Sequence, residues 1–183
     1  MGRKFFIPTA FSRFILCGAC LAFVFVILFS FSGAAQSSED YFKTAQEKYE
    51  RSDYEGALSD YSRAISMKPD FTEAYIRRGD IKKMQEDMKG AASDYSRAIE
   101  LDPKNSRALN KRGIIRTIQK DYDGAMEDFN KAILLDAKYT QAFLNRGNCN
   151  LKTGKLNEAC ADFTKAKDLG DKQAAEYLSR YCN

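Results

Sequence analysis

Hydrophobic and polar positions follow a helical period from residue 38 to residue 181. Between residues 57 and 65, for instance, apolar side chains fall three or four residues apart and share one face of a helix, namely Ala57, Leu58, Tyr61, Ala64 and Ile65. No segment shows the strict alternation of a half-buried strand. The pattern predicts helix pairs at 38–50 and 53–66, 72–84 and 87–100, 106–118 and 121–135, and 140–152 and 156–168, with one more helix over Asp171–Tyr181.

The same pattern returns every 34 residues. The phrase DYSRAI at 60–65 recurs at 94–99, and the variants DFNKAI and DFTKAK occupy 128–133 and 162–167. Small residues keep the same step at Ala57, Ala91, Ala125 and Ala159. A fixed period of this length indicates an array of helical hairpins, in which each unit buries its apolar face against its neighbours.

The dipeptide Arg-Gly keeps the period as well, at 78–79, 112–113 and 146–147. Two antiparallel helices approach closely only where small side chains meet, and large residues fill the space beside them. We therefore expect Gly79 to face Ala91, with Tyr75 and Tyr95 filling the space around this contact.

Local signals set the helix ends. An aspartate that can cap free backbone N–H groups precedes the second helix of the first three units, at Asp53, Asp87 and Asp121. Pro69 and Pro103 follow the second helices of units one and two, where they prevent the helix from continuing. Two pairs within the recurring phrase are expected to be surface ion pairs, Asp60 with Arg63 and Asp94 with Arg97.

The order of a large residue, Gly, Ala, an aromatic residue, Ala and Pro over 34 residues resembles the tetratricopeptide repeat (TPR). Four units, at 38–71, 72–105, 106–139 and 140–173, cover 136 of the 183 residues. Ala45 stands in the first unit where the others have Gly, and Ala137 and Asp171 stand where Pro would end the third and fourth. The resemblance implies an all-α fold, a right-handed superhelical solenoid of four TPR helix hairpins plus a C-terminal capping helix in residues 174–183.

The first 35 residues differ in kind from the repeats. Three basic residues precede an apolar run at 14–31, and small residues follow at 32–35. This order is typical of a signal peptide cleaved after residue 34 or 35, which would leave a short leader at 36–37. The apolar run of 18 residues also reaches the lower limit for spanning a bilayer, so a signal anchor is the alternative. The expected location is exported, periplasmic or secreted; the alternative is membrane-anchored by residues 14–31.

Three cysteines lie beyond residue 35, all near the C-terminus. An exported chain meets oxidising conditions, in which a disulfide can hold a frayed terminal helix. We favour Cys160–Cys182, because Cys160 begins the second helix of unit four and Cys182 ends the helix expected to pack antiparallel to it. Cys149 with Cys182 is the alternative, since these residues fall at nearly the same height on adjacent first helices. Three reduced thiols are the remaining possibility.

The net charge of +4 comes mostly from the leader. Without its three bases, 26 Lys and Arg face 25 Asp and Glu, a balance that gives no electrostatic footprint for nucleic acid. The chain has no histidine and no Cys-x-x-Cys beyond residue 35, which excludes Ser–His–Asp and Cys–His mechanisms and disfavours a zinc site. We predict no enzyme, no catalytic residue, no metal and no cofactor.

Protein binding is then the expected function. In the TPR family the first helices line a concave groove that receives an extended peptide or a partner's helix. The resemblance places these residues of the chain at the groove: Phe42, Gln46, Tyr49, Arg77, Asp80, Lys83, Arg107, Asn110, Lys111, Ile114, Asn145 and Asn148, together with Glu73, Ile76, Gln141 and Leu144. Arg77, Arg107 and Lys111 can hold a carboxylate or an acidic peptide, or they are solvated and partly neutralised by Glu73 and Asp80.

Some family members grip the acidic tail of cytosolic heat-shock chaperones with a clamp of Lys, Asn and Arg. Arg107 and Lys111 resemble part of this clamp, but Phe42, Gln46 and Arg77 stand where Lys, Asn and Asn are needed, so chaperone-tail binding is not predicted. The expected function is an exported adaptor for a protein or peptide partner in a cell-envelope or secreted complex. The alternative is a membrane-tethered, self-associating scaffold with an uncleaved anchor.

Overall fold

The computed structural model describes residues 36–182, and the leader predicted for residues 1–35 lies outside them. Residues 36–182 form α-helices and no strand, as predicted. The helices are α2 (Ser38–Glu50), α3 (Tyr54–Met67), α4 (Thr72–Met84), α5 (Met88–Leu101), α6 (Ser106–Ile118), α7 (Tyr122–Leu135), α8 (Thr140–Lys152), α9 (Leu156–Asp168) and α10 (Lys172–Tyr181).

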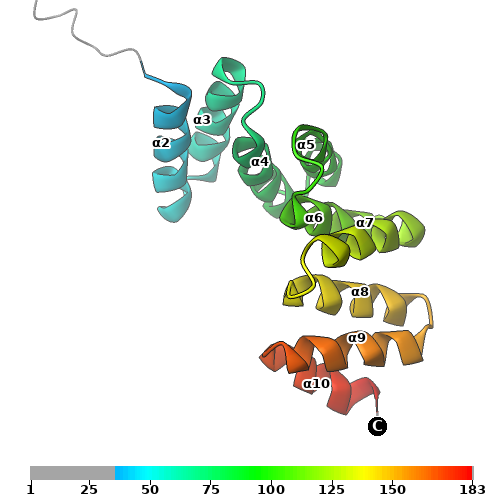
Figure 1. Cartoon of the computed structure of the whole chain (residues 1–183). Coiled ribbons are helices and arrows are strands. Elements are labelled where there is room, and N and C mark those ends of the chain that lie inside the picture. Colours follow the sequence, from blue (N-terminus) through cyan, green and yellow to red (C-terminus); the bar gives the residue numbers. More distant parts are fainter. Residues whose placement is uncertain (1–35, 183) are drawn as a thin grey trace, which may run out of the picture. The chain divides into compact units, whose positions relative to one another are not determined.

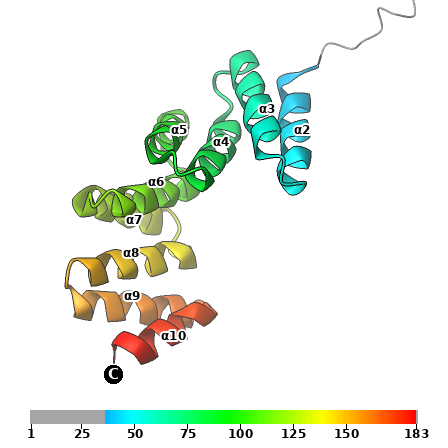
Figure 2. The same cartoon turned by 180° about the vertical axis from the view of Figure 1, so that it is seen from behind.

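Successive helices form hairpins, and the hairpins stack in chain order (Figure 1). α2 packs on α3, α4 on α5, α6 on α7 and α8 on α9, while the second helix of each hairpin contacts the first helix of the next. α10 packs on α9 at the C-terminal end. The helix axes turn from one hairpin to the next, which the view from behind also shows (Figure 2). The all-α superhelical solenoid inferred from the repeat is confirmed.

The second helices of the first three units begin where the sequence predicts a cap. A side-chain oxygen of each aspartate accepts a hydrogen bond from the backbone N–H three residues ahead, at 2.9–3.1 Å, in Asp53, Asp87 and Asp121. The helices therefore start one residue later than expected, because the aspartate itself is the N-cap. Lys155 takes this place before α9 and makes no side-chain cap.

The turn that follows the second helix keeps one geometry across the first three units, although Ala137 replaces the proline in the third. The residues that end these helices have φ from −134° to −141° and ψ from 86° to 93°, at Lys68, Asp102 and Asp136. After α9 the chain turns differently, through Gly170 at φ +94°, and Asp171 caps α10. Proline is therefore dispensable for the repeat turn, and the last turn belongs to a separate class.

Each Arg-Gly glycine makes room for the aromatic ring of the recurring phrase. A Cβ on Gly79 would lie 2.8 Å from Cε1 of Tyr95, closer than real Cβ contacts allow. The next two units repeat this relation, Gly113 with Phe129 and Gly147 with Phe163. The expectation that Tyr95 fills the space beside Gly79 is confirmed.

The arginine beside each glycine binds the aspartate that opens the recurring phrase. Arg112 donates from Nε to Oδ2 of Asp128 at 2.9 Å and from Nη2 to Oδ1 at 2.7 Å. Its Nη1 donates to Oγ of Ser96 in the preceding unit at 3.2 Å, so one side chain joins three helices. Arg78 does the same with Asp94 and Ser62, and Arg146 with Asp162 and Asn130.

These contacts correct one of the expected surface ion pairs. Asp94 is buried and pairs with Arg78 and Lys82, while Arg97 pairs with Glu100 at 2.9 Å. The expected pair of the first unit is present, but loose, at 3.7 Å between Nη1 and Oδ1. The recurring phrase therefore has a physical cause: its Asp binds an arginine, its aromatic ring fills the glycine gap, and its Ser or Asn binds the arginine of the next unit.

The C-terminal helix is held against the last hairpin by a cysteine pair and by stacked rings. The sulfurs of Cys160 on α9 and Cys182 after α10 lie 2.03 Å apart, at bonding distance, as in the favoured pairing. Cys149 is buried on α8 and unpaired, so the alternative pairing is wrong for this structure, and burial raises the pKa of its thiol. The rings of Phe163 and Tyr177 stack with centroids 4.9 Å apart.

Candidate functional site

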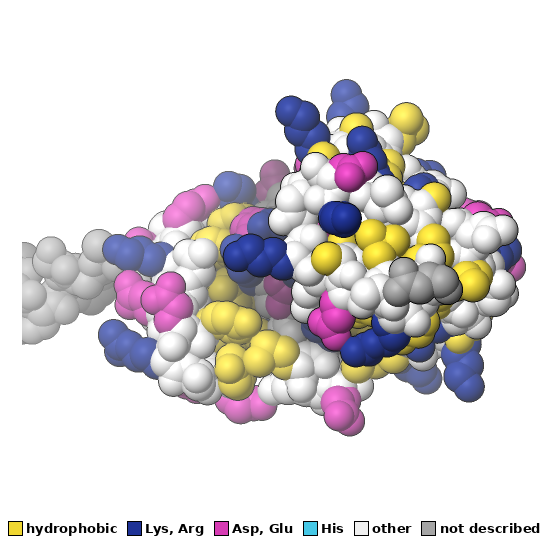
Figure 3. Space-filling model, turned by 90° about the horizontal axis from the view of Figure 1, so that it is seen from below, with side chains coloured by type: hydrophobic (Ala, Val, Ile, Leu, Met, Phe, Trp, Pro, Cys, Tyr) yellow, Lys and Arg dark blue, Asp and Glu magenta, His cyan; other side chains and the backbone are white. Residues whose placement is uncertain are grey.

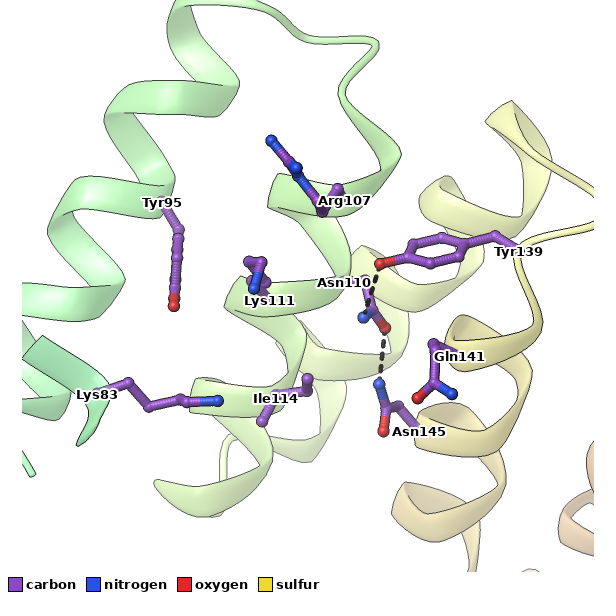
Figure 4. A pocket seen from close by; sticks show the side chains of 9 residues that line it. All are labelled: Lys83, Tyr95, Arg107, Asn110, Lys111, Ile114, Tyr139, Gln141 and Asn145. Carbon is purple, nitrogen blue, oxygen red and sulfur yellow. Dashed lines mark hydrogen bonds between the residues drawn. The ribbon is translucent and has the colours of Figure 1, made fainter. Parts of the chain in front are cut away.

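Three adjoining pockets run along the first helices. The cationic pocket, about 260 Å³, is lined by Lys83, Tyr95, Arg107, Asn110, Lys111, Ile114, Tyr139, Gln141 and Asn145 (Figure 4). The apolar pocket, about 210 Å³, is lined by Ile114, Thr117, Ile118, Phe129, Asn145, Asn148 and Lys152. The terminal pocket, about 370 Å³, is lined by Asn148, Leu151, Lys152 and Tyr181.

The three pockets adjoin one another, because neighbours share lining residues, and together they make up the groove. The cationic and apolar pockets share Ile114 and Asn145, and the apolar and terminal pockets share Asn148 and Lys152. The lining passes from α4 across α6 and α8 to α10. A single extended segment can therefore contact all three pockets.

Two arginines meet on one carboxylate at the edge of the cationic pocket. Arg77 donates from Nε to Oε1 of Glu73 at 2.8 Å, and Arg107 donates from Nη2 to the other oxygen of the same carboxylate. The side chains are about a third to two fifths exposed, so water screens the ion pairs. One negative charge offsets only one of the two arginines.

Asp80 stands beside the cationic pocket and binds two of its lining side chains. Its Oδ1 accepts a hydrogen bond from Nζ of Lys111 at 2.7 Å and another from the hydroxyl of Tyr95 at 2.7 Å. Burial, together with the negative charge and the hydrogen bond of Asp80, raises the pKa of Tyr95, so the phenol stays protonated and donates. Lys111 is thereby held in place and its charge is offset.

Lys83 leaves the cationic pocket with surplus positive charge. Within residues 36–182 no acid lies at ion-pair distance from its ammonium group. Four cations in and beside the pocket, Arg77, Lys83, Arg107 and Lys111, face the two carboxylates of Glu73 and Asp80, an excess of two positive charges. On the face shown in Figure 3, Lys and Arg lie interspersed with Asp and Glu. The excess marks the cationic pocket as a place for a negatively charged group.

A chain of hydrogen bonds fixes the wall between the cationic and apolar pockets (Figure 4). Asn145 donates from Nδ2 to Oδ1 of Asn110 at 2.9 Å, and Asn110 donates from its own Nδ2 to the hydroxyl of Tyr139 at 3.3 Å. Asn110 is only 4% exposed, so the relay is largely removed from water. A buried, satisfied amide holds α6 and α8 in a fixed relation.

Large apolar side chains extend the groove toward α2. Ile118, at the end of α6, lines the apolar pocket and is 51% exposed. Met84, at the end of α4, is 47% exposed, and the hydroxyl of Tyr49 on α2 lies 3.6 Å from its sulfur. Met84 and Ile118 occupy the same place in successive units, and exposed apolar side chains at such a repeated place favour an interaction surface.

The structure brings half of the sixteen residues assigned to the groove to its lining, namely Lys83, Arg107, Asn110, Lys111, Ile114, Gln141, Asn145 and Asn148. Arg77 and Asp80 stand beside the cationic pocket through their ion pairs. Phe42, Gln46 and Tyr49 line none of the three pockets.

Three residues assigned to the groove take part in packing. The ring of Phe42 lies 4.8 Å from that of Phe71 and 5.4 Å from that of Tyr61, and it packs, partly buried, against the core of the first unit. Ile76 and Leu144 are buried among the residues of the second helices, so the expectation that they face the groove is wrong.

Several residues that line the groove were not predicted from the sequence. Tyr95 was assigned to packing, and its ring does pack, but its hydroxyl reaches the groove. Tyr139 lies in the turn before α8, and Ile118 and Lys152 are the last residues of their helices. The signal for the last two was their place at the ends of first helices, where the chain turns away and leaves a side chain uncovered.

The groove offers cations, amides, hydroxyls and an apolar floor, the groups that hold a peptide by charge-assisted hydrogen bonds and burial. In residues 36–182 no cluster of three or more His, Cys, Asp or Glu side chains is placed to hold a metal ion. No helix in this part of the chain has the length and apolar character needed to cross a membrane.

Similar folds occur among solved structures. MamA superposes with a TM-score of 0.69 at 22% identity, over 86% of this chain and 90% of that chain. PilF of Pseudomonas aeruginosa gives 0.70 at 22% identity, over 78% and 68%. The first TPR domain of Spaghetti (RPAP3), solved with the HSP90 peptide SRMEEVD, gives 0.58 at 24% identity, over 61% and 90%. At these identities the likeness shows the fold alone.

Sequence comparison decides the family. Comparison with curated protein sequences gives no match. Family models described as tetratricopeptide repeat match residues 42–106, 84–140 and 140–173, which together cover most of the chain. The period, the hairpin stack and the family models agree, and the chain belongs to the tetratricopeptide repeat family.

Proposed function

We propose that this chain is a non-catalytic adaptor that binds an extended segment of a partner protein in the groove. The proposal rests on one observation: a cation-rich pocket adjoins an apolar pocket, and the two share Ile114 and Asn145. A segment with a carboxylate followed by an apolar side chain can satisfy both pockets at once. The structure of the RPAP3 domain with an HSP90 peptide rich in acidic residues supports this class of ligand.

We also propose that the repeats act outside the cytoplasm, in the assembly of a cell-envelope or secreted complex. The order of basic residues, apolar run and small residues in the first 35 positions supports export. Intact mass of the protein from its native host tests this. A chain that begins near Gln36 supports export with cleavage, and a chain that keeps residues 14–31 supports the membrane-tethered scaffold instead.

Site-specific photo-crosslinking tests the groove directly. A photo-reactive amino acid at position 118, in the apolar pocket, should crosslink to a partner protein in native cells. The matched control is position 134, where Leu134 is 85% exposed but lies outside the groove. Equal crosslinking from both positions, or from position 134 alone, would place the partner elsewhere.

Charge reversal tests the cationic pocket. Among the described residues, Lys83 is the cation of this pocket without an acidic partner, so Lys83→Glu should lower partner capture while folding is unaffected. Lys131→Glu makes the same charge change at an exposed position on α7 and should leave partner capture intact. If both variants capture the partner as well as the unmodified chain, the cationic pocket is not the binding site.

A further inference from the structure

In three of the four units the buried aspartate of the recurring phrase binds a cation other than the arginine of Arg-Gly. This cation comes from one place on the first helix, four residues after the place of the Arg in Arg-Gly, and its distance to the carboxylate is 2.6–3.0 Å: Lys48 with Asp60, Lys82 with Asp94 and Arg116 with Asp128. In the fourth unit Asn150 stands at that place and donates from Nδ2 to Oδ2 of Asp162 at 3.1 Å. The amide replaces the hydrogen bond of the cation but not its charge.

The exchange leaves an unused acceptor inside the protein. Asn150 is 2% exposed, and its Oδ1 has no hydrogen-bond partner within residues 36–182. An amide oxygen removed from water without a donor is costly, so such an atom calls for a bound group that donates to it. The orientation of the amide is fixed, because its Nδ2 already serves the carboxylate of Asp162.

A pocket of about 300 Å³ lies at this place, between α7, α8 and α9. It is lined by Met126, Arg146, Asn150, Lys155, Glu158, Ala161 and Asp162. Glu158 adds an acid where the other three units have glycine, at Gly56, Gly90 and Gly124. The fourth unit has thus lost a cation and gained a carboxylate at the same spot. This pocket shares no lining residue with the groove.

The two cations that line this pocket, Arg146 and Lys155, differ in their partners. Arg146 is fully engaged, because it binds Asp162 at 2.6 Å and Asn130 at 2.7 Å and lies over the ring of Phe143. Lys155 stands at the exposed rim and makes no ion pair with the acids of residues 36–182. Glu158 therefore faces the pocket with only Lys155 as a possible internal competitor.

We propose that this pocket binds a primary alkylammonium ion, the group shared by a free polyamine and by a lysine side chain of another protein. Its three N–H donors meet Oδ1 of Asn150 and the carboxylates of Glu158 and Asp162, while its alkyl chain lies against Met126 and Ala161. The ligand restores from outside the cation that Lys82 and Arg116 supply from within in units two and three.

NMR titration of the ¹⁵N-labelled chain tests the site with named probes. Cadaverine represents the free amine, N-acetyl-lysine-N-methylamide represents a lysine side chain, and the norleucine analogue of the latter is the neutral control. We expect saturable shifts of the Asn150 side-chain amide and of the Glu158 backbone with an ammonium probe, and none with norleucine. Binding of cadaverine alone assigns the site to free amines, and binding of the capped lysine assigns it to a partner protein. Absence of saturable shifts with both overturns the proposal.

Three variants distinguish binding at this pocket from a general electrostatic effect. Asn150→Lys supplies the missing cation and should abolish the shift of the Glu158 backbone, with the urea midpoint reporting that the variant folds. Glu158→Gly restores the residue of the other units and should weaken binding about tenfold, as expected for the loss of one charge-assisted hydrogen bond. Lys155→Ala removes the competitor and should tighten binding. Weaker binding in Lys155→Ala, or unchanged binding in Asn150→Lys, contradicts the site.

Discussion

Arg112 binds Asp128 through two parallel hydrogen bonds across a hairpin, although the two residues are sixteen positions apart in the chain. The carboxylate is 1% exposed, and the same guanidinium also reaches Ser96 of the preceding unit. One side chain therefore fixes both the geometry of its own hairpin and the contact between two hairpins. The consequences of removing it can be measured.

Arg112→Ala should lower the free energy of unfolding by about 3 kcal/mol, because among residues 36–182 it leaves the buried carboxylate of Asp128 with Arg116 alone as a cationic partner. Urea denaturation measures this change. Arg63→Ala is the matched control, since that arginine is 61% exposed and lies 3.7 Å from its acid, and it should change stability by no more than about 0.5 kcal/mol. Equal effects of the two substitutions would show that burial does not set the strength of these pairs.

Gly113→Ala should destabilise the third unit by roughly 1–3 kcal/mol, because the new Cβ would lie 2.6 Å from Cε1 of Phe129. Phe129→Leu in the same chain removes the ring that clashes with the new Cβ. In a double-mutant cycle the two substitutions together should cost less than the sum of their separate effects. Simple additivity would mean that the glycine is needed for some reason other than the ring.

Reduction of the Cys160–Cys182 pair should lower the free energy of unfolding by about 3 kcal/mol, as expected for opening a loop of 22 residues. In the chain beyond residue 35, thiol labelling after denaturation without reductant should detect one cysteine, Cys149. In the folded state the same thiol should react slowly, because burial raises its pKa and blocks access. Three labelled thiols without reductant would show that no disulfide forms.

Stability should decline at alkaline pH through the buried tyrosines. Burial raises the pKa of Tyr61 from 10.0 to about 12, so the folded chain keeps a proton that the unfolded chain releases. The contribution is therefore complete below pH 10 and is lost as the pH rises toward about 12. Urea midpoints at roughly pH 9 and 11 should differ less in Tyr61→Phe than in the unmodified chain. An identical decline in both would exclude Tyr61 as a cause.

The helices and their caps could be predicted because they depend on neighbours within one turn. Asp53 caps α3 through a residue three positions ahead, and the apolar period alone places the helix. Even the repeat turn could be predicted, although Ala137 shows that its proline is not required. The leader lies outside the described residues, and its role stays a prediction.

The errors arise where a distant partner overrides a local rule. A spacing of three residues suggested Asp94 with Arg97, but Arg78 reaches Asp94 from the facing helix and offers two hydrogen bonds in a buried site. Tyr95 escaped assignment to the groove because its ring obeys the packing pattern while its hydroxyl does not. Side chains with an apolar body and a polar tip serve two surfaces at once, and a pattern of residue types records only one of them.

The arginine that reaches back to the preceding hairpin makes the array modular in length. Units one to three each present a Ser or Asn acceptor on the second helix, and units two to four each insert one arginine into the unit before, so the same joint recurs at Ser62, Ser96 and Asn130. A whole 34-residue unit can be spliced in or out without leaving an unmatched joint. Chains with three or five units would have shorter or longer grooves on the same framework. The length of the recognised segment would then depend on the number of units.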